Sequence, residues 1–187
     1  FTIFSDYERR FTDALYKFAR YGEIAAELGA KYINLHGGKP HSSLSDEEYC
    51  ERYMALKNAC LKNGVTVLQE NVANFRSGDC EFLESMRNIL GDDAEFCFDI
   101  KQSVRRGYLP LEMLERFHKN IKHYHISDHS LSGDCLLPLK GGFDFKAMFD
   151  FLKTKGYNGN IIIEVYKNAY KSYDEIYDSY NELKKLL

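Results

Sequence analysis

Hydrophobic and polar positions along the chain follow two patterns, and each pattern predicts a different element. In the longer segments apolar residues recur every three or four positions, which is typical of helices with one buried face. These predicted helices cover residues 7–28, 45–63, 79–90, 110–119, 143–155 and 173–187. Between them lie short runs rich in Ile, Val, Leu, Phe, Tyr and Cys, which predict strands. The predicted strands cover residues 31–35, 65–68, 94–98, 121–128 and 160–165.

Local signals support several of these boundaries. Ser45 followed by Glu48 matches a capping box, in which each residue bonds to the backbone N–H of the other. Gly29 and Gly64 are placed to end the first two helices. Residues 130–142 contain no clear periodicity and form the longest segment that we expect to be irregular.

Strands separated by helices of about 10–15 residues imply right-handed parallel crossovers, so the fold class is parallel α/β. No linker or change of composition divides the chain, and we expect a single domain over residues 1–187. The first strand is not followed by Gly-x-Gly-x-x-Gly, the signal of a dinucleotide-binding sheet. Polar residues at the carboxyl ends of several strands are instead typical of a (β/α)₈ TIM barrel.

Five strands do not close such a barrel, which typically needs about 250 residues. The chain begins abruptly at Phe1-Thr-Ile-Phe and ends in an amphipathic helix. We therefore expect the C-terminal five βα units of an eight-fold barrel, with the N-terminal units absent from this chain.

Composition excludes some functions. The 187 residues are 44% hydrophobic and 28% charged, which suits one globular core. A net charge of −3 gives no attraction for nucleic acid, no apolar stretch of about 18 residues could span a membrane, and no secretory leader is evident. We expect a cytoplasmic protein. The five cysteines have no Cys-x-x-Cys spacing, so we expect reduced thiols.

Candidate chemistry lies at the ends of the strands. Glu70, Asp99, His125 and Glu164 come from four different strands, and parallel strands can bring such ends around one mouth. Three carboxylates and one imidazole favour a divalent metal of intermediate hardness, with Mn²⁺ ahead of Mg²⁺ or Co²⁺. Zn²⁺ is also compatible with this donor set.

Each of these residues has a purely structural alternative. Glu70 and Asp99 could cap the helices that follow them, Glu164 could pair with a lysine, and His125 could be a core residue. The repetition of the pattern in strand after strand favours a common site.

The order and spacing of these segments resemble the xylose isomerase-like TIM barrel superfamily, which groups sugar-phosphate isomerases and epimerases with endonuclease IV. Residues 26–36 resemble the strand that supplies a histidine, and 68–71 the strand with a metal-binding glutamate. Residues 98–102 resemble its Asp-x-x-His motif, 123–128 its His-x-x-Asp strand, and 156–164 its closing strand. The resemblance covers nearly the whole chain.

Departures from the family pattern separate its branches. Endonuclease IV-like members bind three zinc ions and need histidines where this chain has Gln102 and Leu136. The chain therefore resembles the isomerase and epimerase branch, in which the four residues named above stand at the metal ligands. The resemblance implies proton abstraction next to a carbonyl through an enediolate, with Glu70 and Glu164 as general base and acid.

Six further residues near the predicted site are candidates for binding substrate. They are His36, Lys101, Gln102, His123, Asp128 and Asp134. Lys101 is unusual because it places a cation two positions after a predicted ligand, where it could neutralise an anionic substrate group. Arg105 and Arg106 are expected at the surface or against an anionic group.

The leading hypothesis is thus a metal-dependent isomerase or epimerase whose partner is a small sugar or sugar-derived molecule, with no nucleic acid or membrane partner. The question of a homo-oligomer is left open. Two alternatives are an endonuclease IV-like zinc phosphodiesterase acting on abasic DNA, and a sugar-binding barrel without catalysis.

Overall fold

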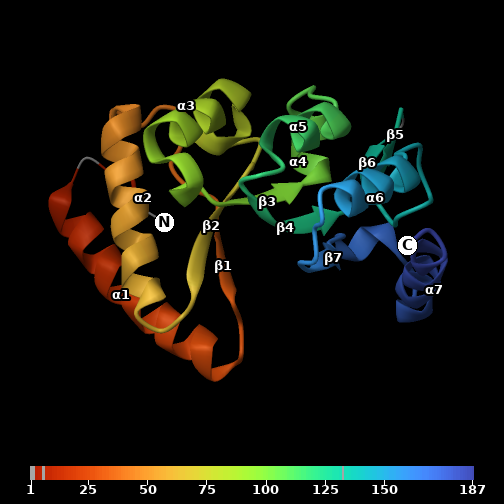
Figure 1. Ribbon diagram of the computed structural model, residues 1–187, viewed down its shortest axis with the longest axis horizontal. Helices are drawn as coiled ribbons and strands as arrows, with labels where there is room; N and C mark the ends of the chain where they lie inside the picture. Colours follow the sequence, from red (N-terminus) through yellow and green to blue (C-terminus); the bar gives the residue numbers. More distant parts are fainter. Residues whose placement is uncertain (1–2, 6, 132) are drawn as a thin grey trace. The chain divides into compact units, whose positions relative to one another are not determined.

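The computed structural model describes residues 3–5, 7–131 and 133–187 and shows the expected alternation of helices and strands (Figure 1). Phe1 and Thr2, which belong to the abrupt start noted in the sequence, lie outside the described residues. The α-helices are α1 (Glu8–Glu27), α2 (Asp46–Leu61), α3 (Cys80–Leu90), α4 (Ile100–Arg105), α5 (Pro110–Phe117), α6 (Phe145–Thr154) and α7 (Tyr173–Lys184). The 3₁₀ turns are η1 (Arg76–Gly78), η2 (Gly91–Asp93) and η3 (Lys167–Ala169).

The strands are β1 (Tyr32–Leu35), β2 (Thr66–Glu70), β3 (Phe96–Asp99), β4 (Ile121–Ile126), β5 (Asp128–Ser130), β6 (Gly133–Leu136) and β7 (Ile161–Ile163). Hydrogen bonds join five of them in the order β1-β2-β3-β4-β7, and the registers of β1 with β2, β2 with β3 and β4 with β7 are parallel. The fold class is therefore parallel α/β, as the sequence predicts.

The chain forms two compact units. The first comprises the described residues up to Cys97 together with His118–Lys122, and the second comprises Phe98–Phe117 and His123–Leu187. Strands β3 and β4 each begin in the first unit and end in the second.

In the first unit, α1 and α2 lie side by side (Figure 1). A Cβ atom on Gly22 would lie 2.9 Å from the Cα of Cys60, so only glycine permits this close crossing. Tyr49, Tyr53 and Leu56 of α2 are completely buried. The predicted capping box is present, because Ser45 accepts the N–H of Glu48 at 3.2 Å and Glu48 accepts that of Ser45 at 2.7 Å.

In the second unit, α6 buries one apolar face, as its helical spacing predicts. The buried residues are Phe145, Met148, Phe149 and Leu152. Strand β4 buries Tyr124 and Ile126, whereas Ile162 in β7 is half exposed. All five cysteines of the chain are buried free thiols.

Two elements differ from the prediction. Residues 100–105, which none of the predicted helices or strands covers, form α4 because Asp99 caps its first turn by accepting the N–H of Lys101. Part of the segment expected to be irregular, residues 130–142, forms a short antiparallel hairpin of β5 and β6.

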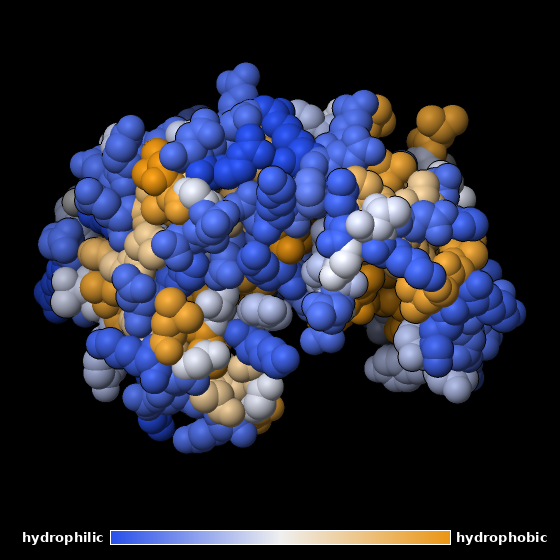
Figure 2. Space-filling model, viewed as in Figure 1, coloured by the Kyte–Doolittle hydropathy of each residue, from blue (hydrophilic) through white to orange (hydrophobic). Residues whose placement is uncertain are grey.

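No helix in the described part of the chain is long and apolar enough to cross a membrane. Hydrophilic residues dominate the face seen in Figure 2, with orange groups between them.

Candidate functional site

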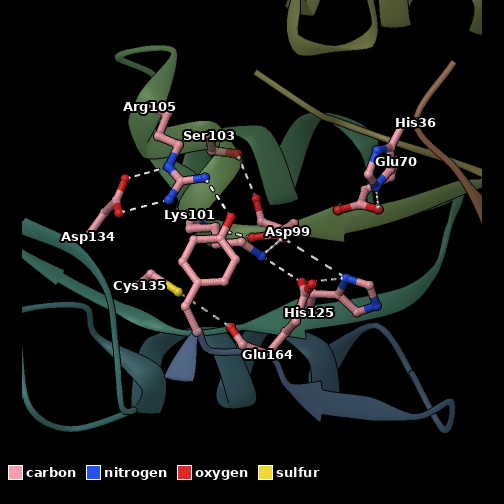
Figure 3. A network of polar contacts seen from close by, with 11 residues as sticks. His36, Glu70, Asp99, Lys101, Ser103, Arg105, His125, Asp134, Cys135 and Glu164 are labelled. Atoms are coloured by element: carbon pink, nitrogen blue, oxygen red, sulfur yellow. Dashed lines mark hydrogen bonds and ion pairs between the residues drawn. The ribbon is translucent and has the colours of Figure 1, made fainter. Parts of the chain in front are cut away.

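Three predicted site residues of the second unit lie together (Figure 3). Asp99 is the last residue of β3, His125 lies in β4, and Glu164 directly follows β7. The Nδ1 atom of His125 is 2.9 Å from an oxygen of Glu164 and 4.0 Å from an oxygen of Asp99. Parallel pairing explains the approach of His125 and Glu164, because β4 and β7 remain bonded up to the Glu164 N–H, which donates to Ile126 O at 2.9 Å.

Lys101 lies in the middle of this group. Its ammonium donates to one carboxylate oxygen of Asp99 and, at 2.6 Å, to Glu164. The side chains of Lys101 and Asp99 are 2% and 1% exposed, whereas that of Glu164 is 41% exposed. The structural alternatives considered for Asp99 and Glu164 are therefore both present: Asp99 caps α4, and Glu164 pairs with a lysine.

Burial and charge shift these groups in opposite directions. Burial raises the pKa of Asp99 to about 7, although the ammonium of Lys101 opposes this shift. The hydrogen bond with His125, assisted by Lys101, lowers the pKa of Glu164 below its usual range. Burial disfavours the charged form of Lys101, but its two carboxylate partners outweigh that cost and raise its pKa. Glu164 and Lys101 are therefore both charged at neutral pH.

A second ion pair lies at the rim of this group. Arg105 donates to both carboxylate oxygens of Asp134, at 2.6 and 3.0 Å, and to the hydroxyl of Tyr166 at 3.1 Å. The hydrogen bond from Arg105 lowers the pKa of Asp134. Arg105 thus contacts an anionic group, as expected, and that group is the carboxylate of Asp134. Sequence reasoning missed Tyr166, which lies 61 residues from its partner.

In the first unit, Glu70 ends β2 and is 4% exposed. The Nε2 atom of His36 lies 3.6 Å from a carboxylate oxygen of Glu70, and the imidazole itself is largely exposed. The two predicted residues therefore form a pair in which the histidine faces solvent and the carboxylate is covered.

A buried hydrogen-bond network fixes the backbone next to His36. Gln69 donates its side-chain amide to the carbonyls of Leu35 and His36, and it accepts the hydroxyl of Tyr49 at 2.6 Å. Ser77 also donates to the His36 carbonyl, at 3.1 Å. Sequence reasoning missed Tyr49, Gln69 and Ser77. The available signal was Gly37, because a glycine beside a candidate residue marks a close backbone approach.

The remaining candidates are also buried. Gln102 lies in α4, and the ring of His123 in β4 meets that of His125 edge to face at 5.2 Å. The carboxylate of Asp128 accepts the backbone N–H groups of His129, Gly141 and Phe143 at 2.7–2.9 Å. Asp128 therefore closes the base of the loop that contains β5 and β6.

The second unit offers a donor set that fits a divalent cation. Asp99, His125 and Glu164 each present one ligand atom, and these atoms lie within 4.8 Å of one another. The oxygens that hold the Lys101 ammonium show that this point already attracts positive charge. Two carboxylates and an imidazole suit Mn²⁺, Co²⁺ or Zn²⁺.

The chain matches the protein family described as Xylose isomerase-like TIM barrel over residues 3–185. Among curated proteins it is 32% identical over 89 residues to "Probable endonuclease 4" of Haloarcula marismortui. That match spans 46% of this chain and 32% of the archaeal protein, which is less than two thirds of its length.

Solved structures share the fold at low sequence identity. The 3-keto-D-glucoside 4-epimerase of E. coli is 20% identical with a TM-score of 0.76, and the match covers 98% of this chain and 74% of the epimerase. A D-tagatose 3-epimerase-like protein is 23% identical with a TM-score of 0.75, covering 98% and 72%. The IOLI protein, solved with a zinc atom, is 20% identical with a TM-score of 0.71, covering 95% and 69%.

Proposed function

Since the chain belongs to the xylose isomerase-like TIM barrel family, we propose that it is a divalent-metal-dependent isomerase or epimerase of a small sugar or sugar-derived substrate. The observation that carries the proposal is the convergence of Asp99, His125 and Glu164 within 4.8 Å. The epimerases of similar fold support the choice of reaction. The proposed reaction is transfer of the proton next to a carbonyl group.

Glu70 is proposed as the fourth ligand beside Asp99, His125 and Glu164. In the family resemblance described above, Glu70 stands at one of the four metal ligands, which supports this role. A bound Mn²⁺, or Zn²⁺ as in the IOLI protein, would supply Lewis-acid stabilisation of the enediolate charge.

Glu164 and Glu70 are proposed to exchange the proton. Glu164 is proposed as the base because its side chain is 41% exposed and is therefore open to a substrate. The side chain of Glu70 is buried, and the Nε2 atom of His36 lies 3.6 Å from its carboxylate. His36, Lys101, Gln102, His123, Asp128 and Asp134 are proposed to orient the substrate or the residues that touch it.

Proton transfer can be tested directly in heavy water. The chain would be loaded with Mn²⁺ and incubated with a panel of ketoses, and deuterium next to the carbonyl would be measured by NMR. We expect Glu164→Gln to slow the exchange by about 10²–10⁴-fold, the usual contribution of a general base. Glu182→Gln is the matched control, because Glu182 forms an exposed ion pair with Lys185.

The similarity to an endonuclease 4 protein favours a second candidate, a zinc phosphodiesterase acting on abasic DNA. Gln102 and Leu136 stand against it, because they replace two histidines of the three-zinc centre in the resemblance described above. Elemental analysis separates the candidates: about one metal per chain supports the isomerase or epimerase, whereas two or three zinc ions with cleavage of abasic DNA would overturn it.

A further inference from the structure

Lys101 places a cation of the chain itself where the proposed metal would bind. Its ammonium contacts one oxygen of Asp99 and one oxygen of Glu164, and these are the same two oxygens that His125 Nδ1 approaches. The side chain of Lys101 is only 2% exposed, although lysine is rarely buried without a reason.

The ammonium and a divalent cation require the same oxygens. Hydrogen bonds between charged partners are about twice as strong as neutral ones, so Lys101 holds both carboxylates firmly. The other oxygen of Asp99 is already engaged, because it accepts the Lys101 N–H at 2.9 Å and caps α4. A metal at this point therefore needs Lys101 to leave.

Charged and aromatic groups face the ammonium from several elements, and Asp134 of β6 lies near enough to interact with it electrostatically. Asp99 comes from β3, His125 from β4 and Glu164 from the residue after β7, and the ring of Tyr166 lies 5.8 Å away. The two carboxylates that hold the ammonium are also the groups that a divalent cation would bind, so the two cations compete for the same oxygens.

We propose that Lys101 is an internal competitor for the metal: its ammonium holds Asp99 and Glu164 in the metal-free chain and is displaced when a divalent cation binds. The inference rests on the proposed metal centre. It predicts that Lys101 weakens the affinity for metal and stabilises the metal-free protein. A lysine with only a structural role would not have both effects.

The test measures Mn²⁺ binding by isothermal titration calorimetry, and thermal unfolding with EDTA or with Mn²⁺. Native chain is compared with Lys101→Met, which keeps the length of the side chain, and with Lys101→Gln, which keeps a hydrogen-bond donor. Lys146→Met is the matched control, because it removes one positive charge and one exposed ion pair, with Asp150, from the same unit.

We expect both Lys101 variants to bind Mn²⁺ about tenfold more tightly than the native chain, a change of about 1.4 kcal/mol. In EDTA they should unfold at a lower temperature, and Mn²⁺ should raise their midpoint more than the native one. Lys146→Met should behave as the native chain does. Measurable Mn²⁺ binding by the Lys101 variants, with none by the native chain, would also support the proposal.

Two results would overturn it, and they differ in what else they affect. If the variants bind Mn²⁺ within twofold of the native chain, the competition is wrong and the proposed metal centre stands. If neither native chain nor variants bind any divalent metal, the competition and the metal centre fail together. Circular dichroism establishes that each variant is folded, and Lys101→Gln serves should Lys101→Met fail to fold.

Discussion

At the scale of single residues, Asp99 shows how one carboxylate serves architecture and charge at once. One oxygen accepts the backbone N–H of Lys101 and so begins α4, while the other accepts the Lys101 ammonium. A carboxylate that only capped a helix, or only formed an ion pair, would not need to be completely buried. Asp99 is 1% exposed because it does both at the end of a central strand.

The two ion pairs of the second unit allow burial to be compared directly. Asp99→Asn would leave Lys101 buried without its main partner, which costs about 3–5 kcal/mol of unfolding free energy. Asp134→Asn would break the Arg105 pair, in which both side chains are about 30% exposed, and should cost about 1 kcal/mol or less. Urea unfolding in EDTA measures both. Equal losses would contradict the difference in burial on which the prediction rests.

The sequence was sufficient to find the residues at the strand ends but not their partners. Glu70, Asp99, His125 and Glu164 each follow or end an apolar run, so alternation reveals them one by one. Their pairing depends on tertiary structure, since Lys101 and Glu164 are 63 residues apart. The contact of Tyr49 with Gln69 was not predicted for the same reason. In the sequence, each of the two positions resembles any other position on a buried face.

At the scale of elements, the predicted helices and strands are confirmed where many residues share one spacing of apolar positions. The helices were placed correctly to within a few residues, and the capping box of α2 is present. The hairpin of β5 and β6 was not predicted, because strands of three and four residues are too short to establish a period of two. Helix α4 was not predicted, because six residues are too few to show a helical period and its one local signal is the cap at Asp99.

The turn after β1 gives a prediction about backbone conformation. Gly37 has a φ of +90°, and a Cβ there would lie 2.1 Å from the hydroxyl of Tyr49. Gly64 has a φ of +73° and no atom within 4 Å of the same position. We expect Gly64→Ala to cost about 1 kcal/mol from backbone strain alone, and Gly37→Ala about 3 kcal/mol or more.

Urea unfolding of both variants measures the difference, and Tyr49→Phe provides a further control. In the Tyr49→Phe background the hydroxyl is gone, so the cost of Gly37→Ala should fall toward that of Gly64→Ala, with the Gln69 amide at 3.0 Å as the remaining close contact. An unchanged cost in that background would show that the strain has another source.

At the scale of the whole molecule, membership of the xylose isomerase-like TIM barrel family and the parallel α/β fold agree with what the sequence indicated. Regular alternation of helix and strand signals specifies such a fold because each βα unit repeats the same right-handed crossover. The metal and the substrate remain predictions, because neither is part of the chain.

The buried hydroxyls and thiols of the first unit predict how stability responds to alkaline pH. Burial raises the pKa of Cys60 to about 11 and that of Cys50 to about 12, and it raises the pKa values of Tyr49 and Tyr53 further. In the unfolded chain these groups lose their protons from about pH 8.5 to pH 10. The unfolded state then binds fewer protons than the native state, so stability falls as pH rises.

We expect the urea midpoint, followed by circular dichroism in a reducing buffer, to be lower at about pH 10.5 than at about pH 8. Metal-free buffer with EDTA keeps the carboxylate site from contributing. A midpoint that does not change over this interval would mean that the native chain admits enough water to ionise these groups in place.

The carboxylate of Asp128 has a consequence for how this protein could change over evolution. It fastens residues 129, 141 and 143 to one another, so the intervening segment is joined to the barrel at a base that does not depend on what lies between. Exposed positions inside that closed ring, such as Leu131, can be exchanged while the three bonds at its base are kept. The surface there can thus vary without altering β3, β4 and β7, which position the residues of the proposed site.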